Sequence, residues 1–223
     1  MVCPPAPLDR RWGKTYHHFF NPNWTENGRS NPVRIRSRDG LIVVDIQKDF
    51  CPGGSLSVDR GDRVVPVINR LIPKFSHVFL SRDWHPPNHC SFSHSPKFVD
   101  KSWPVHCVAG SPGAEFHPLL SIPELAIVID KGVDPDREAY SAFEETNLAK
   151  FLRDRGIDRI FVAGLATDYC VKSTVLDALN QGFETFLVQD ACRGVDNPPG
   201  SVDKAIKEMK ESGASPVRSE VFE

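Results

Sequence analysis

The chain has 223 residues and a formal net charge of −2, with 40% hydrophobic and 25% charged residues. This length suits one large α/β domain that buries a substantial core. The balanced charge provides no basic face or acidic tail, which argues against nucleic acid or a membrane surface as a partner. The longest apolar runs, such as 41–44 and 126–129, are far too short to span a bilayer.

The start of the chain and its cysteines bear on the cellular compartment. No charged segment followed by an apolar core is present near the N-terminus, so we expect no secretory signal. The six cysteines include no C-x-x-C pair, and they are too sparse for a disulfide scaffold. We therefore expect reduced cysteines and a cytoplasmic protein.

Two parts of the chain differ in pattern. Residues 1–38 are rich in proline and lack sustained periodicity, so we expect an N-terminal extension that is irregular or partly disordered. Residues 39–223 alternate strand-like and helix-like segments, which predicts one domain with a mostly parallel six-stranded sheet and helices on both faces. In the first half we expect a strand at 41–46, a helix at 63–75 that Pro66 and Pro73 shorten or bend, and strands at 78–81 and 125–129. A helix from Ser141 to about Arg155 and a strand at 159–163 follow. The last expected elements are a helix at 169–181, a strand at 184–188, a helix at 202–212 and an edge strand at 217–221.

Cys170 is the first candidate for chemistry. It lies in the first turn of a predicted helix that follows the strand at 159–163. Unpaired N–H groups and the positive dipole end of a helix favour a thiolate. A thiolate beside such donors is the geometry of an acyl-transfer nucleophile with its oxyanion hole. The alternative is a buried, inert thiol.

Charged residues occupy equivalent places on two other strands. Asp45 lies near the end of the first strand, and Lys131 ends the third in Ile-Val-Ile-Asp-Lys-Gly. Ligands of open parallel sheets bind at the carboxyl ends of the strands, where Cys170 is also expected. A helix cap or ion pair for Asp45, and a solvated strand end for Lys131, are the structural alternatives. Together the three residues indicate a base, a cation and a thiol at one edge.

A second cluster has the composition of a metal site. Asp83 and His85 are two residues apart at the end of the second strand, so their side chains share one face. His106 can return from the long loop to complete two imidazoles and one carboxylate. This set suits zinc, manganese or iron with open positions for water or substrate. Hydrogen-bonded turn residues are the alternative for Asp-x-His, and His89 is a candidate extra ligand.

Several motifs in one order resemble a known family. The chain is similar to the nicotinamidase (pyrazinamidase) branch of the isochorismatase-like cysteine hydrolases over residues 40–221. The motifs are the strand that carries Asp45 and Phe50, Asp83-Trp-His85, Ser-Trp-Pro-Val-His106-Cys, Lys131-Gly, Ala-Tyr140-Ser-Ala-Phe143 and Gly-Leu-Ala-Thr-Asp-Tyr-Cys170. Residues 1–38 have no counterpart in this resemblance.

The resemblance implies the role of each site residue. It implies a parallel sheet of about six strands and a cis peptide bond between Leu165 and Ala166. For the ligand set above we expect one divalent ion, zinc first, with manganese or iron as alternatives. The position of His89 is a ligand in some family members only, so it stays unassigned. The implied residues are a catalytic triad of Asp45, Lys131 and Cys170, oxyanion donors at the Ala166 and Cys170 N–H groups, metal ligands Asp83, His85 and His106, and a substrate pocket of Phe50, Trp103 and Tyr140.

The resemblance also implies an activity. We expect a metal-dependent amidohydrolase that converts nicotinamide to nicotinate and ammonia through a cysteine thioester, as in NAD salvage, and that also accepts pyrazinamide. A related cysteine hydrolase of an N-carbamoyl or ureido substrate, a non-catalytic binding protein, and metal-activated water with Cys170 as a bystander are the alternatives. The sequence leaves open the native metal, the preference among nicotinamide analogues, homo-oligomerisation and the role of residues 1–38.

Overall fold

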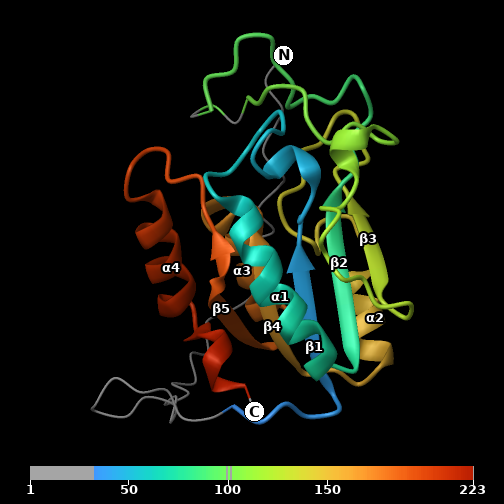
Figure 1. Ribbon diagram of the computed structural model, residues 1–223, viewed down its shortest axis with the longest axis vertical. Helices are drawn as coiled ribbons and strands as arrows, with labels where there is room; N and C mark the ends of the chain where they lie inside the picture. The colour runs from blue at the N-terminus through green and yellow to red at the C-terminus, as the bar shows by residue number, and fades with distance from the viewer. Residues whose placement is uncertain (1–32, 99, 101, 223) are drawn as a thin grey trace.

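The computed structural model describes residues 33–98, 100 and 102–222. Residues 1–32, which hold most of the expected N-terminal extension, lie outside the described residues. The described chain forms one six-stranded sheet in the order β3-β2-β1-β4-β5-β6, and every pair of neighbouring strands is parallel (Figure 1). The strands are β1 (Asp39–Val44), β2 (His77–Asp83), β3 (Ile127–Lys131), β4 (Arg159–Leu165), β5 (Glu184–Arg193) and β6 (Ser215–Val217). The predicted fold class is confirmed.

Helices cover both faces of the sheet. Helix α1 (Val65–Leu71) lies in front of the sheet in Figure 1, and α2 (Leu148–Asp154) lies behind it. Helices α3 (Lys172–Asn180) and α4 (Ser201–Glu211) pack into the same apolar layer as α2. The central strands β1 and β4 are buried on both sides, because alternate side chains enter the two layers. No helix among the described residues has the length and apolar character that crossing a membrane requires.

Proline shortens the first helix, as the sequence predicts. The expected helix at 63–75 is present as α1 with a 3₁₀ turn on either side, η2 (Gly61–Val64) and η3 (Ile72–Lys74). Pro66 lies in the first turn of α1, where a missing N–H costs nothing. Pro73 lies in the first turn of η3, so the α-helical hydrogen bonds end before it.

The start of α2 differs from the prediction. Glu144 makes its half of the capping box, because it accepts hydrogen bonds from the backbone N–H groups of Tyr140 (2.7 Å) and Ser141 (2.9 Å). The Ser141 hydroxyl accepts from the Phe143 N–H at 3.1 Å. Glu145 then adopts a left-handed conformation with φ of 54°. This conformation interrupts the helix, so α2 begins only at Leu148.

The strand boundaries and the cysteines give further corrections. Strands β2, β4 and β5 run two to five residues further toward their carboxyl ends than the apolar runs predict, and β6 ends at Val217, before a 3₁₀ turn. Among the described cysteines, four are free thiols. Cys90 is disulfide-bonded, so the expectation of reduced thiols throughout is wrong for this residue.

Candidate active site

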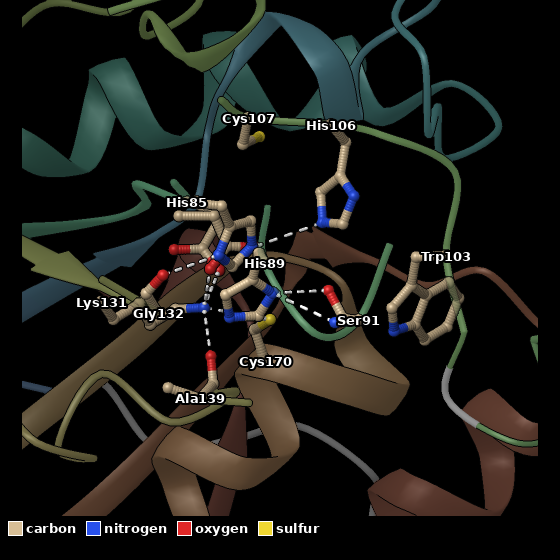
Figure 2. A network of polar contacts seen from close by, with 12 residues as sticks. His85, His89, Ser91, Trp103, His106, Cys107, Lys131, Gly132, Ala139 and Cys170 are labelled. Atoms are coloured by element: carbon tan, nitrogen blue, oxygen red, sulfur yellow. Dashed lines mark hydrogen bonds and ion pairs between the residues drawn. The ribbon is translucent and has the colours of Figure 1, made fainter. Parts of the chain in front are cut away.

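Three strand ends bring the predicted triad together. Asp45 directly follows β1, Lys131 is the last residue of β3, and Cys170 lies in a single π-helical turn (Thr167–Val171) after β4. Lys131 Nζ is 3.0 Å from Asp45 Oδ2 and 3.4 Å from Cys170 Sγ. All three side chains are buried. Figure 2 shows the Lys131 ammonium between the Cys170 sulfur and the carbonyl of Ala139, to which it donates at 3.2 Å.

The backbone and one neighbour orient the Asp45 carboxylate. Asp45 has a left-handed backbone with φ of 50°, which turns its side chain out of the strand direction. The Ser81 hydroxyl donates a hydrogen bond to Asp45 Oδ1 at 2.7 Å. Within the described part of the chain, Oδ2 has no hydrogen bond of good geometry. This oxygen can therefore accept a proton.

The electrostatics of the triad correct one expectation. Burial raises the pKa of the Cys170 thiol well above its ordinary value, against the lowering effect of Lys131, and the neighbouring carboxylates raise it further. This direction favours the thiol over the thiolate, opposite to the effect expected from a helix N-terminus. Burial opposes the Lys131 ammonium, but Asp45 and Asp83 raise the pKa of Lys131 well above 10.5. The triad thus places a fixed cation beside the Cys170 sulfur.

The second predicted cluster also converges. Asp83 Oδ2 lies 3.5 Å from His85 Nε2 and 4.0 Å from His106 Nε2. One ligand atom from each of the three residues falls within 4.8 Å of the other two, and all three residues are buried. Asp83 also bonds to Lys131 through its other oxygen, Oδ1. The triad and the carboxylate–imidazole cluster therefore share one hydrogen-bonded unit.

The two histidines present the correct nitrogen for a metal. His85 Nδ1 donates to the Gly132 carbonyl at 2.9 Å, and His106 Nδ1 donates to the Pro104 carbonyl at 2.8 Å. A carbonyl accepts only, so each neutral ring keeps its lone pair on Nε2, which faces Asp83. Metal-binding histidines are held in this way. Burial lowers the pKa of His106 to about 4, so this ring is neutral at neutral pH. The donor set fits a divalent ion.

Gln47 holds Asp83 in place. Its side-chain Nε2 donates to the Asp83 carbonyl at 2.8 Å, and its Oε1 accepts from the Asp83 N–H at 2.8 Å. Nε2 also donates to the Ala114 carbonyl at 3.0 Å. The Gln47 side chain is fully buried. It fixes the end of β2 because it pairs with both the N–H and the C=O of Asp83. The sequence analysis missed it, because a glutamine three residues beyond a strand carries no signal of burial.

His89 lies beside the cluster but is engaged elsewhere. Its Nε2 donates to the Arg137 carbonyl at 2.8 Å, so its Nδ1 accepts from the Ser91 hydroxyl at 2.7 Å. The ring packs on His85 with centroids 4.2 Å apart. Both nitrogens are thus occupied by protein groups, and His89 supports His85 rather than offering a lone pair.

A pocket of about 470 Å³, including its open mouth, joins the two clusters. Trp103 Nε1 donates to the Tyr140 hydroxyl at 2.9 Å, which fixes two aromatic walls against each other. Of the predicted residues, its lining includes Phe50, Asp83, Trp103, His106, Tyr140, Ala166 and Cys170. Pocket residues that the sequence analysis missed are Leu56, Val58, Glu138, Tyr169 and Val195.

The missed residues gave little signal in the sequence. Glu138 follows several charged residues of an exposed loop and reads as one more solvated charge. Val195 lies just beyond β5, and only the paired strand ends bring it near Cys170. Tyr169 is the exception, because a residue next to the candidate nucleophile could have been included.

The turn that carries Cys170 has unusual backbone geometry. The expected cis peptide bond between Leu165 and Ala166 is present. The Ala166 carbonyl accepts hydrogen bonds from the N–H groups of Tyr169 (3.0 Å) and Val171 (3.1 Å). Gly164 has φ of 130°, and a Cβ at this position would lie 2.1 Å from the Val44 carbonyl oxygen. The close approach of β4 to β1 therefore requires glycine.

Comparisons with known proteins identify the family of this chain. A family model described as the isochorismatase domain matches residues 39–221. The nicotinamidase of Escherichia coli (strain K12) is 44% identical over 196 residues, which are 78% of this chain and 92% of that protein. The pyrazinamidase of Pyrococcus horikoshii, solved in complex with zinc, is 45% identical with a TM-score of 0.73, over 81% of this chain and 99% of that chain. PnC1 from L. infantum, solved in complex with nicotinate, is 36% identical with a TM-score of 0.78, over 86% of this chain and 98% of that chain.

The chain therefore belongs to the isochorismatase domain family, in its nicotinamidase and pyrazinamidase branch. This confirms the family resemblance that the motifs predict.

Proposed function

We propose that this protein is a nicotinamidase, which hydrolyses nicotinamide to nicotinate and ammonia and also accepts pyrazinamide. The observation that carries the proposal is that buried Lys131 contacts Cys170, Asp45 and Asp83 beside two imidazoles, next to a pocket that Cys170 and Asp83 line. A cysteine with a general base serves amide hydrolysis, and aromatic walls suit a flat heteroaromatic ring. The names of the E. coli and P. horikoshii relatives, and the nicotinate in the L. infantum structure, support this substrate class.

The triad performs the first half of the reaction. Asp45 Oδ2 takes the proton of the Cys170 thiol, and the Lys131 ammonium stabilises the thiolate as it forms. The sulfur attacks the carboxamide carbon. The N–H groups of Ala166 and Cys170 hold the tetrahedral oxyanion, and losing one such donor typically raises the barrier by about 3 kcal/mol.

The second half reverses the proton path. Asp45 returns the proton to the departing ammonia, which leaves an acyl group on Cys170. Asp45 then accepts a proton from the water that attacks the thioester carbonyl. The C–S bond breaks, nicotinate leaves, and Asp45 returns its proton to the Cys170 sulfur. Lys131 stays protonated throughout because Asp45 and Asp83 raise its pKa.

Asp83, His85 and His106 are the residues that would hold a divalent ion, for which we propose zinc. When bound, the ion supplies a Lewis acid for a ring nitrogen and for water. Nε2 of both rings faces the Asp83 carboxylate, which supports this assignment.

An N-carbamoyl or ureido substrate is the alternative for the same nucleophile. The carboxylate–imidazole cluster in the pocket argues against it, because the chemistry at the cysteine alone does not need these ligands. A non-catalytic binding protein is disfavoured by the retention of both complete clusters. Metal analysis of the purified protein distinguishes the nicotinamidase from the ureido hydrolase. Absence of a stoichiometric divalent ion would favour the ureido substrate.

Ammonia release from nicotinamide by the purified, metal-replete protein tests the proposal. We expect turnover with nicotinamide and pyrazinamide, loss of turnover after chelation, and recovery on adding zinc. A folded, metal-replete protein that releases no ammonia from either amide would exclude the nicotinamidase assignment. Release from a ureido compound under the same conditions would then establish the alternative.

A further inference from the structure

The loop after β3 forms one wall of the candidate metal site. Its Gly132 carbonyl accepts from His85 Nδ1, and its Ala139 carbonyl accepts from Lys131 Nζ. Glu138 lies directly before Ala139 and lines the same pocket as Asp83 and Cys170. Hydrogen bonds to the site therefore hold the backbone of this loop both before and after Glu138. They restrict where the Glu138 side chain can lie.

One oxygen of Glu138 has no partner. Oε1 accepts a weak hydrogen bond from the Ala139 N–H at 3.2 Å. Oε2 is buried and has no hydrogen-bond partner among the residues that the structure describes. A buried polar atom without a partner costs on the order of 1–3 kcal/mol, so such an atom generally has a donor in the functional state. The mechanism above gives Glu138 no role that would supply this donor.

The carboxylate shares its pocket with two of the expected metal ligands. Glu138 lines the same pocket as Asp83 and His106. A donor for Oε2 is therefore needed inside this pocket.

We propose that Glu138 Oε2 accepts a hydrogen bond from a water molecule bound to the divalent ion of the Asp83–His85–His106 site. The inference rests on the proposed function, because it requires that metal site. Glu138 is a positioning residue in this role: it orients the water and strengthens metal binding without contacting the ion. Three protein ligands leave positions for water on a four- to six-coordinate ion. Groups outside the ligand set typically change metal affinity by 10–100-fold.

The metal affinity of Glu138 variants tests this role directly. Glu138→Gln keeps the shape of the side chain and removes its charge, and Glu138→Ala removes the acceptor. Glu145→Gln is the matched control, because it removes an exposed carboxylate that pairs with Arg137 of the same loop. Zinc dissociation constants would be measured by competition with a chromogenic chelator on proteins whose folding is verified by circular dichroism. The visible absorption spectrum of the Co²⁺-substituted proteins would report the ligands and bound water of the ion.

We expect zinc to bind 10–100-fold more weakly to Glu138→Ala and less weakly to Glu138→Gln, with a changed Co²⁺ spectrum in both. Glu145→Gln should match the wild type. Wild-type zinc affinity and an unchanged Co²⁺ spectrum in both Glu138 variants would overturn the role of Glu138 and leave the nicotinamidase proposal intact. A wild-type protein that binds no divalent ion would overturn the inference together with the metal site.

Discussion

Cys170 and Lys131 are in contact at 3.4 Å, and Asp45 lies 3.0 Å from the same ammonium. Groups that act as one unit give non-additive losses, so removing the nucleophile alone removes most of the catalysis. We expect Cys170→Ala to lower kcat/KM for nicotinamide by on the order of 10⁴-fold or more. Zinc affinity should be nearly unchanged, because Cys170 is not one of the expected ligands.

The control for this variant is Cys192→Ala, which removes another buried thiol from β5. It should keep its kcat/KM and lose only some thermal stability. Near-normal turnover by Cys170→Ala would contradict the thioester mechanism and establish metal-activated water as the nucleophile.

His89 makes the stability of the metal-free protein depend on pH. Burial lowers its pKa from 6.5 to about 4. Between these values the unfolded chain binds a proton that the folded chain does not, so the contribution of neutral His89 is present above pH 6.5 and is lost as the pH falls toward 4. The loss at pH 4.5 relative to pH 7.5 is on the order of 2 kcal/mol.

The contribution of neutral His89 to stability is measured by urea unfolding of the wild type and His89→Gln at pH 7.5 and 4.5, in the presence of a metal chelator. The stability of the wild type relative to the variant should decrease at the lower pH. Exposed His94→Gln is the control and should keep a constant difference from the wild type. A difference for His89→Gln that does not change with pH would show that His89 is not buried in its neutral form.

At the level of elements, the contact between β1 and β4 depends on Gly164. A Cβ at this position would meet the Val44 carbonyl oxygen at 2.1 Å and the Val44 nitrogen at 2.7 Å, and both are backbone atoms of a central strand. Neither can move without breaking the ladder that precedes Asp45. We expect Gly164→Ala to lower the free energy of unfolding by roughly 3 kcal/mol or more, because a clash adds to the strain of a positive φ.

Gly182→Ala provides a matched comparison for Gly164→Ala. Gly182 also has a positive φ, of 87°, but its Cβ would meet no atom within 4 Å. Strain alone should cost about 1 kcal/mol there. Thermal melts of both variants measure the two costs. Equal losses of stability in the two variants would indicate that the clash with Val44 adds nothing to the strain of a positive φ.

Most elements of this fold could be predicted because each has a local signal. Apolar runs predict all six strands, and the prolines predict the shortened α1. The late start of α2 could not be predicted, because Glu144 makes its half of the capping box and only the left-handed Glu145 interrupts the helix. The π-helical turn at Cys170 was likewise hidden, since its sequence is also compatible with a regular helix.

The candidate site could be predicted to the extent that it lies at strand ends. Asp45, Lys131 and Cys170 each end or follow a parallel strand, so the tendency of ligands to bind at the carboxyl edge of a parallel sheet is enough to group them. Glu138 and Gln47 depend on contacts between distant segments. Gln47 acquires its role only when β2 ends beside it, and Glu138 only when its loop folds over Asp83.

At the scale of the whole molecule, the site and one stabilising ion pair lie at opposite ends of β1. Asp39 begins the strand, and Arg159 begins its neighbour β4. Arg159 donates to Asp39 Oδ1 at 2.8 Å and Oδ2 at 2.5 Å, and also to the Arg34 carbonyl at 2.7 Å. Asp45 directly follows β1, six residues beyond Asp39 and about 20 Å away at 3.3 Å per residue. Substitution of Asp39 should therefore affect folding and spare the chemistry.

We expect Asp39→Ala to lower the free energy of unfolding by about 3–5 kcal/mol, because it leaves the buried Arg159 guanidinium without its partner. For a chain of this size that is on the order of 10 °C in Tm. Asp154→Ala, which breaks the exposed pair with Lys150, should cost less than about 0.5 kcal/mol. Calorimetry and ammonia release at 20 °C separate stability from activity. A lower kcat in folded Asp39→Ala would mean that the two ends of the sheet are coupled, whereas an unchanged kcat with a lower Tm is expected if the parallel sheet holds each end independently.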